Sequence, residues 1–269
     1  MMIKRIISGF WIVSIVIASL LIDWWYNFRI CDLVVIALIV LGLREFFRML
    51  EHKGIATYKY FGICMGAIIP ISIMLQFELT KKWEFLFIVI ALLFLILMQF
   101  KRRESAGVTI GVSTTLFGIF YVSWFFSFLL KIKYLNHGLG ILSSILLITK
   151  LGDIGAYFIG SRFGKIPLLP HISPKKTVEG AVGGLFFSVL GACLSKPFLS
   201  FSYPHLIFLG ISLGIIGQLG DLSESLIKRD CQIKDSGDLL PGMGGILDEI
   251  DSLLFTAPVF YFYMSSIVR

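Results

Sequence analysis

Nine long apolar runs dominate the sequence and restrict the class of fold that the chain can adopt. Each run approaches the ~20 apolar residues that a helix needs to cross the hydrocarbon core of a bilayer. We therefore predict an all-α integral membrane protein, a polytopic bundle of about nine transmembrane helices. The predicted spans lie near residues 6–22, 31–47, 60–76, 84–100, 108–130, 138–160, 180–195, 203–219 and 250–266.

The composition excludes most other classes of protein. Of the 269 residues, 57% are hydrophobic and only 15% are charged, whereas soluble domains carry roughly 25% charged residues. A water-soluble globular enzyme and a disordered tail are both excluded. The net charge of +7 fits Lys and Arg in loops beside anionic lipid. Nucleic acid is not an expected partner, because no basic stripe interleaved with aromatic residues lies outside an apolar run.

The basic residues also predict an orientation in the membrane. If the N-terminus is cytoplasmic and nine spans alternate, 16 of the 24 Lys and Arg residues fall in cytoplasmic segments and seven in outside segments. Lys150 lies within a span. Cytoplasmic loops carry an excess of Lys and Arg, so we predict a multi-pass protein of the cell (inner) membrane with a cytoplasmic N-terminus.

The two halves of the chain differ in their polar residues. Residues 1–137 consist of apolar runs and short basic loops, and their predicted role is scaffold and lipid contact. Residues 138–269 carry two polar stretches, and we predict that they form the catalytic region with loops at the cytoplasmic face.

The first polar stretch runs from Lys150 to Gly184. Asp153 interrupts an apolar span, and an acid at membrane depth is costly, so its default interpretation is functional. The alternative is a structural pair with Lys150, one turn earlier. The run Ser173–Thr177 then precedes a new apolar run and contains two adjacent lysines. Two ammonium groups, a hydroxyl and a helix N-terminus suit a phosphate group; a basic juxtamembrane loop is an equally good interpretation.

The second polar stretch, Gly220–Ser252, is the strongest signal in the chain, because it holds eight of the 17 acidic residues. Asp221 ends one apolar span, and Asp248 and Asp251 open the next, three residues apart and on one helix face. Carboxylates that converge at a membrane face repel each other unless a cation lies between them. Mg²⁺ takes oxygen ligands and usually bridges to substrate phosphates.

Basic and glycine residues accompany these acids. Lys228, Arg229 and Lys234 are available to phosphate oxygens, and the glycines of Pro241–Gly245 let backbone N–H groups approach an anion. A tight turn that reverses the chain is the simpler explanation of the glycines alone. Together the three features favour Mg²⁺-dependent phosphoryl or nucleotidyl transfer at the cytoplasmic face of a membrane.

These residues resemble a known family. The run SLIKRDCQIKDSGDLLPGMGGILDEID, from Ser225 to Asp251, resembles the signature of the phosphatidate cytidylyltransferases (CDP-diacylglycerol synthases), and so do the upstream runs GDIGAY and ISPKKTVEG. The resemblance implies a membrane enzyme of many helices that joins CTP and phosphatidic acid to give CDP-diacylglycerol and pyrophosphate, with Mg²⁺ as its cofactor.

The resemblance also implies roles for individual residues. The acids nearest the metal would be Asp221, Asp248 and Asp251, with Lys228 as a further catalytic residue beside them. Phosphates would be held by the basic residues Lys175, Lys176, Lys228, Arg229 and Lys234. The site would be completed by Asp153, a further candidate metal ligand, and by Ser173, Thr177, Asp235, Gly244 and Gly245.

Two positions depart from the family signature. Met243 stands where the family commonly has His, and Glu249 where it commonly has Arg. The first change leaves no imidazole in the loop, so a histidine base there cannot operate. The second removes a cation from the phosphate site and adds an acid.

Other interpretations of the sequence stay open at this point. Another membrane enzyme that uses CTP, such as a polyisoprenol kinase or transferase, would need similar acids and lysines. A divalent-cation transporter would use the intramembrane acids Asp153, Asp221 and Asp251. A degenerate family member would only bind or scaffold. A homodimer is compatible with the sequence but is not indicated by any residue.

Overall fold

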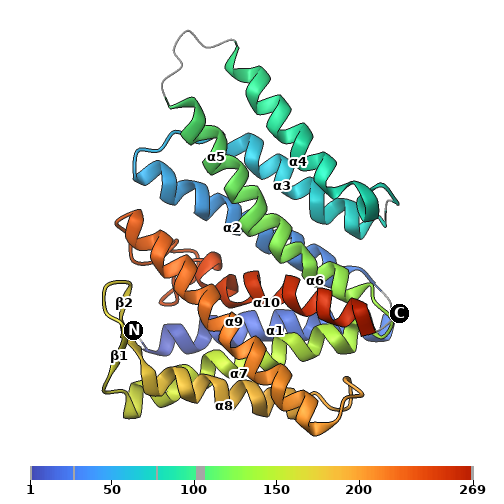
Figure 1. The fold of residues 1–269 in the computed structure, drawn as a ribbon, viewed down its shortest axis with the longest axis vertical. Helices are drawn as coiled ribbons and strands as arrows, with labels where there is room; N and C mark the ends of the chain where they lie inside the picture. Colours follow the sequence, from blue (N-terminus) through green and yellow to red (C-terminus); the bar gives the residue numbers. More distant parts are fainter. Residues whose placement is uncertain (1, 27, 77, 101–106, 268–269) are drawn as a thin grey trace. The chain divides into compact units, whose positions relative to one another are not determined.

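The structure is a computed structural model that describes residues 2–26, 28–76, 78–100 and 107–267. Four of the basic residues on which the predicted orientation depends lie outside the described residues: Lys101, Arg102, Arg103 and Arg269. Within the described residues, each of the nine predicted apolar ranges overlaps a helix. The all-helical architecture is thereby confirmed, with one small addition, a two-stranded hairpin (Figure 1).

The chain divides into two compact units, which are described separately. One unit contains residues 1–130 and 231–249, and the other contains residues 131–230 and 250–269. This division groups the glycine-rich segment before residue 250 with the N-terminal helices. The predicted roles of residues 1–137 as scaffold and of residues 138–269 as the catalytic region do not follow from this division and stay a prediction.

The first unit is built from N-terminal helices that follow the apolar runs. Its helices are α1 (Met2–Tyr26), α2 (Ile30–His52), α3 (Lys59–Met74), α4 (Glu78–Gln99), α5 (Val108–Gly118), the π-helix η1 (Ile119–Trp124) and the start of α6 (Phe125–Lys133). Phe46 and Phe47 of α2 are fully buried. The Phe47 ring packs against Gly62 of α3, and the Phe46 ring packs against Gly118 of α5. A Cβ at either glycine would lie less than 3 Å from the phenyl ring, so only glycine fits there. Small residues let membrane helices approach closely in this way.

The second unit is a layered set of long helices. Its main elements are α7 (Gly138–Phe163), α8 (Val178–Leu194), α9 (Tyr203–Asp230) and most of α10 (Ile246–Ile267). Helices α7 and α8 lie side by side over their length (Figure 1). Gly155 of α7 faces the Phe187 ring, and Gly210 of α9 faces the Val189 backbone, at distances that leave no space for a Cβ. The glycines of the apolar runs therefore set the helix spacing.

A short antiparallel hairpin interrupts the second unit between α7 and α8. Strand β1 (Pro167–Leu169) pairs with β2 (Ser173–Thr177), so the Ser173–Thr177 run, which was predicted only as a loop, is a strand. The helix start predicted after Thr177 is confirmed, because Thr177 is the N-cap of α8 and its Oγ1 accepts a hydrogen bond from Gly180 N at 3.1 Å.

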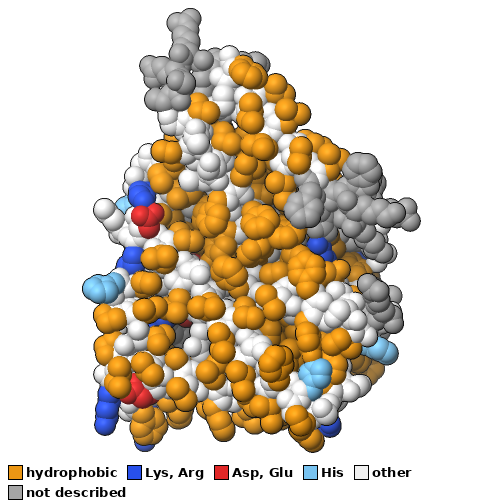
Figure 2. All heavy atoms as spheres, viewed as in Figure 1, with side chains coloured by type: hydrophobic (Ala, Val, Ile, Leu, Met, Phe, Trp, Pro, Cys, Tyr) orange, Lys and Arg blue, Asp and Glu red, His pale blue; other side chains and the backbone are white. Residues whose placement is uncertain are grey.

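Length and composition mark four helical stretches as able to cross a membrane: 108–133, 138–163, 203–230 and 246–267. Many large apolar side chains of these and neighbouring helices are exposed, such as Phe158 on α7, Phe186 on α8 and Phe208 on α9. Figure 2 shows hydrophobic side chains over most of the visible face, with few charged groups among them. A water-soluble monomer rarely exposes so much contiguous apolar surface. The structure thus agrees with a membrane protein.

Candidate active site

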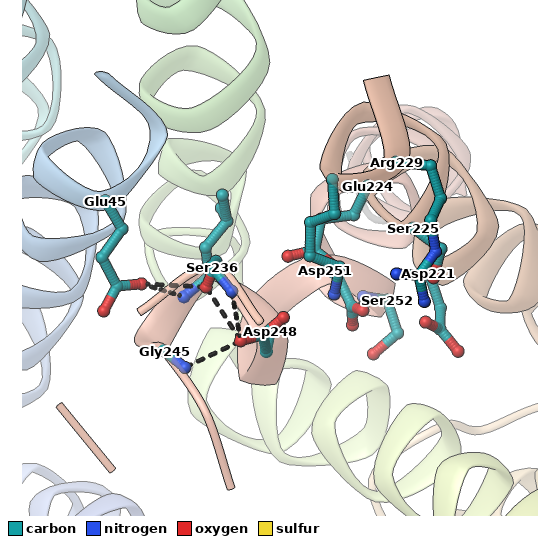
Figure 3. A network of polar contacts seen from close by, with 12 residues as sticks. Glu45, Asp221, Glu224, Ser225, Arg229, Ser236, Gly245, Asp248, Asp251 and Ser252 are labelled. Carbon is teal, nitrogen blue, oxygen red and sulfur yellow. Dashed lines mark hydrogen bonds and ion pairs between the residues drawn. The ribbon is translucent and has the colours of Figure 1, made fainter. Parts of the chain in front are cut away.

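Three carboxylates from two helices converge in the second unit. Asp221 and Glu224 lie three residues apart on α9, and Asp251 is on α10 (Figure 3). One oxygen of each carboxylate lies within 4.8 Å of the others. Gly220 allows the approach, since a Cβ there would come within 2.6 Å of the Asp251 carbonyl oxygen. The predicted proximity of Asp221 and Asp251 is therefore confirmed, and Glu224 joins them.

The acid cluster, as we call Asp221, Glu224 and Asp251, is largely withdrawn from solvent. Glu224 is 0% exposed and Asp251 is 6% exposed. Taking a carboxylate out of water costs several kcal/mol unless a counter-charge compensates. Glu224 and Asp251 are buried beside the partly exposed Asp221, and this arrangement requires nearby positive charge.

Two lysines supply part of that counter-charge. The Lys176 Nζ lies 2.6 Å from Asp221 Oδ1 and donates to Ser225 Oγ at 3.3 Å. Lys228, one turn after Glu224 on α9, forms an ion pair with it and is also buried. Both lysines were predicted as phosphate-handling residues, and the structure brings both to the acid cluster. They offset two of its three negative charges.

Asp153 also reaches α10. Its Oδ2 accepts a hydrogen bond from Ser252 Oγ at 3.0 Å and lies 3.2 Å from Lys150 Nζ. The pair with Lys150, the structural alternative raised by the sequence, is therefore present. Ser252 directly follows Asp251 in the chain, so Asp153 is tied to the helix turn that carries one of the clustered acids.

The hairpin is attached to α9 at two points. Lys176 of β2 contacts Asp221 and Ser225, as described above, and Arg229 donates through Nε to the Ile172 carbonyl oxygen at 3.0 Å. Ser173 and Thr177 are partly buried on the same strand, while Lys175 is exposed. The predicted residues of β2 are thus held beside α9, and the Lys175 side chain is open to solvent.

The base of the hairpin is held by another carboxylate, Glu179 in the first turn of α8. It accepts hydrogen bonds from the backbone N–H groups of Lys165 at 3.0 Å and Ile166 at 3.2 Å. The Lys165 N–H is the main reason that the pKa of Glu179 lies below its ordinary value. The ionised carboxylate therefore joins the end of α7 to the start of α8.

The glycine-rich segment before α10 folds in the first unit as a compact turn. Leu240 and Gly244 form an isolated antiparallel bridge, and the Leu240 N–H donates to the Gly244 carbonyl oxygen at 2.9 Å. Gly242 and Gly244 both have positive φ values, 85° and 112°, which residues with a Cβ rarely adopt. We call residues 235–245 the glycine loop. Its tight-turn interpretation is confirmed.

Asp248 anchors this loop. Its Oδ2 accepts hydrogen bonds from Ser236 N, Ser236 Oγ and Gly245 N at 2.9, 2.9 and 2.7 Å (Figure 3). The contact with Gly245, three residues earlier, resembles the backward contact of a capping box at a helix start. The sequence predicted Asp248 as a metal-holding acid. In the structure its Oδ2 accepts hydrogen bonds that fix the conformation of the glycine loop.

The remaining predicted residues of this segment lie on or beside the loop. Lys234 and Asp235 are exposed, and Gly244 faces Asp248, where a Cβ would lie 2.5 Å from Oδ2. Met243, one of the two departures from the family signature, is close to Gly9 of α1 and fills space there with its thioether. No imidazole occupies this position.

Two buried acids at or near these sites, Glu224 and Glu45, were not predicted to act there. Glu224 stands three residues after Asp221, and this helical spacing could have indicated it. Glu45 accepts hydrogen bonds from the start of α10 and lies in the 31–47 apolar run, where a buried acid is itself a signal. Its first partner there, Ile246, is 201 residues away in the chain, and the sequence carries no sign of that contact.

Comparison with known proteins places these features in a family. Residues 3–267 match the profile of the Cytidylyltransferase family. The chain therefore belongs to the cytidylyltransferase family. Similar proteins bear a more specific name: a phosphatidate cytidylyltransferase of Synechocystis is 33% identical over 97% of this chain and 96% of its own length. That of Bacillus subtilis is 40% identical over 54% of this chain and 55% of its own, and that of Staphylococcus aureus strain COL is 39% identical over 63% and 65%.

Proposed function

We propose that the protein transfers the cytidylyl group of CTP to phosphatidic acid, giving CDP-diacylglycerol and pyrophosphate for phospholipid synthesis. The observation that carries this proposal is the acid cluster of α9 and α10 beside Lys176 and Lys228. Family membership and the names of the relatives support the same reaction.

The acid cluster fits a magnesium ion. All of its donors are carboxylate oxygens, which hard divalent cations prefer, and two lysines leave one of its three negative charges uncompensated. We propose that Asp221, Glu224 and Asp251 hold Mg²⁺, with Asp153 next to them through Ser252. A magnesium ion held there would neutralise the CTP phosphates and polarise the α-phosphorus. Asp248 as a metal-holding acid stays a prediction.

The reaction itself demands little from a general base. A phosphate monoester has a second pKa near 6, so the phosphate of phosphatidic acid is already an anionic nucleophile. One of its oxygens forms a bond to the α-phosphorus of CTP, and the bond from that phosphorus to the bridging oxygen breaks. Pyrophosphate leaves with the bonding electrons. Met243 in place of a histidine is compatible with this chemistry.

The basic side chains of the second unit then neutralise the two reacting polyanions. Lys176 and Lys228 are proposed to move their charge from the carboxylates toward phosphate oxygens when CTP binds. Arg229 holds the hairpin close to α9 through the Ile172 carbonyl. The other proposed substrate-binding residues of the hairpin are Ser173, Lys175 and Thr177.

The glycine loop is the proposed second contact with CTP. Its positive-φ glycines turn backbone N–H groups in directions that suit an anion. The residues assigned to this contact are Lys234, Asp235, Gly244 and Gly245.

We further propose nine membrane spans with a cytoplasmic N-terminus and with the catalytic loops at the cytoplasmic face. The bias of basic residues supports this topology. Phosphatidic acid then enters laterally from the bilayer with its headgroup at the interface. Labelling of single cysteines placed in the loops, in intact cells and in inverted vesicles, tests each assigned side. A homodimer stays a prediction, which the mass of the detergent-solubilised protein tests.

The decisive experiment is a transfer assay on purified protein in detergent micelles. Phosphatidic acid, labelled CTP and Mg²⁺ are expected to yield labelled lipid and pyrophosphate in equal amounts. EDTA is expected to abolish both products, and excess Mg²⁺ to restore them. Polyisoprenol and polyisoprenyl phosphate serve as alternative acceptors. Transfer to a prenol acceptor alone, or no product with any acceptor from a folded preparation, would overturn the proposal.

A further inference from the structure

Glu45 is a buried acid in the half of the chain whose predicted role is scaffold. It lies on α2 and is 2% exposed. Its Oε1 accepts a hydrogen bond from Ile246 N at 3.0 Å, and its Oε2 accepts from Leu247 N at 2.9 Å and from Ser236 Oγ at 3.2 Å (Figure 3). The carboxylate thus binds the first two N–H groups of α10 and one hydroxyl of the glycine loop.

The first N–H groups of a helix have no partner within the helix, and a negative charge beside them is favourable. Glu45 satisfies two of these groups from another helix, and Asp248 satisfies the N–H of Gly245 just before them. The Ser236 hydroxyl lies between the two carboxylates and shares its one proton with them, at 2.9 Å from Asp248 Oδ2 and 3.2 Å from Glu45 Oε2. Glu45 and Asp248, from distant parts of the chain, therefore both accept hydrogen bonds from backbone N–H groups where the glycine loop ends and α10 begins.

The glycine loop packs directly against this carboxylate. A Cβ at Gly245 would lie 2.4 Å from Glu45 Oε2, and a Cβ at Gly237 would lie 2.6 Å from Oε1. The carboxylate of Glu45 occupies the space that a side chain at either position would need. The path of the glycine loop is accordingly set by a residue of α2.

We propose that Glu45 is a positioning residue for cytidylyl transfer. It acts through the glycine loop, holding the backbone of residues 235–245 in the form that receives the CTP phosphates. This inference rests on the proposed function, which assigns that loop to CTP.

A positioning role and a merely structural role predict different kinetics. If Glu45 only stabilised the fold, its loss would reduce the fraction of active protein and leave both KM values unchanged. If it positions the glycine loop, its loss raises the KM for CTP and leaves the KM for phosphatidic acid unchanged. The two substrates of one reaction thus serve as internal controls for each other.

The test uses Glu45→Gln in the full chain, with Glu51→Gln as the matched control on the same helix. Glu51 is exposed and pairs with Lys59. The amide introduced by Glu45→Gln keeps one acceptor oxygen but turns an NH₂ group toward an N–H donor of α10. We expect the KM for CTP to rise about tenfold or more, with the KM for phosphatidic acid within about twofold of wild type. Glu51→Gln is expected to leave both values unchanged.

Hydrogen exchange gives a second readout that needs no activity. Peptides covering residues 235–247 are expected to exchange faster in Glu45→Gln than in wild type, whereas peptides from α8 are unchanged. If Glu45→Gln does not fold, Ser236→Ala removes the hydroxyl shared by the two carboxylates, and a smaller rise in the KM for CTP is expected from it.

Equal KM values for CTP in wild type and in the folded variants would overturn the positioning role. So would unchanged exchange in residues 235–247. The wild-type protein, assayed in parallel, separates this result from a failure of the proposed function: if wild type transfers no cytidylyl group, the reaction is wrong, while the exchange data still test whether Glu45 holds the loop.

Discussion

Carboxylates serve opposite purposes in the two units of the molecule. In the acid cluster, Asp221, Glu224 and Asp251 face one another and two lysines. At the start of α10, Glu45 and Asp248 face backbone N–H groups and a hydroxyl. Acids of the first kind keep an excess of negative charge that suits a metal ion. Acids of the second kind are matched by fixed donors and determine a backbone path.

The contrast teaches that residue type and burial do not distinguish an acid proposed to hold a metal from a structural one. Glu45 and Glu224 are both buried glutamates on apolar helices. The two glutamates differ in their partners. Glu45 accepts from backbone N–H groups, which are fixed in place, whereas Glu224 pairs with the Lys228 ammonium, whose flexible side chain can also reach a phosphate. The following variants test the contrast, beginning with the largest expected effect.

Asp251→Asn tests the acid cluster directly. Loss of residues that only support metal ligands costs about 10–100-fold, so removal of a carboxylate that holds the metal is expected to lower the transfer rate by more than about 100-fold. Mg²⁺ is expected to raise the unfolding temperature of the wild-type protein and to leave that of the variant unchanged.

Asp230→Asn is the control, because Asp230 is an exposed acid at the end of α9. It is expected to behave as wild type in both measurements. A folded Asp251→Asn protein with near-normal transfer would remove Asp251 from the proposed metal site and weaken the contrast between the two groups of acids.

Asp248→Asn tests whether Asp248 acts with the acid cluster or with the acids that bind backbone N–H groups. Asn keeps a single acceptor oxygen for the donors of Ser236 and Gly245, so the free energy of unfolding is expected to fall by about 0.5–2 kcal/mol, as for other lost helix caps. The transfer rate is expected to fall about 10–100-fold through the displaced loop. Thermal unfolding and the transfer assay measure the two effects.

The two measurements also decide between roles for Asp248. Complete loss of turnover with an unchanged unfolding temperature would group Asp248 with the metal-holding acids, as the sequence predicted. A lower unfolding temperature with an unchanged transfer rate would mean that Asp248 only caps the start of α10.

Glu179→Gln tests the smallest effect, that of an exposed carboxylate with backbone donors. The pKa of Glu179 is lowered in the folded protein, chiefly by the N–H of Lys165, so its contribution to stability is present above the ordinary pKa of Glu and is lost as the pH falls through the lowered value. At about pH 7 the variant is expected to unfold at a slightly lower temperature than wild type.

This difference is expected to shrink as the pH falls below the ordinary pKa of Glu and the wild-type carboxylate becomes protonated. Thermal unfolding of both proteins over a pH series measures it. A difference that is independent of pH would mean that Glu179 acts through packing and not through its charge.

Much of the fold and part of the site were predictable from the sequence. The apolar runs predicted the helices because their length and hydropathy are local properties, and a helix forms its hydrogen bonds within a few residues. The start of α8 at Thr177 followed from local chemistry as well. Asp221, Asp248 and Asp251 were predicted to converge because each stands at an end of an apolar run, and the structure clusters Asp221 and Asp251 but not Asp248 with them. The hairpin was missed because its two strands are short and mostly polar or proline-containing.

The family, the helical architecture and the chemistry of the second half were all implied by residues read in order along the chain. The identity of the acids that meet was not. Asp221 and Glu224 of α9 meet Asp251 only because α10 packs against that face, and Glu45 contacts the start of α10 across 201 residues. Such contacts depend on how helices pack, and packing depends on side chains and glycines from several helices at once. A linear pattern records which residues are acidic, but the donor that each acid faces is a property of the folded chain.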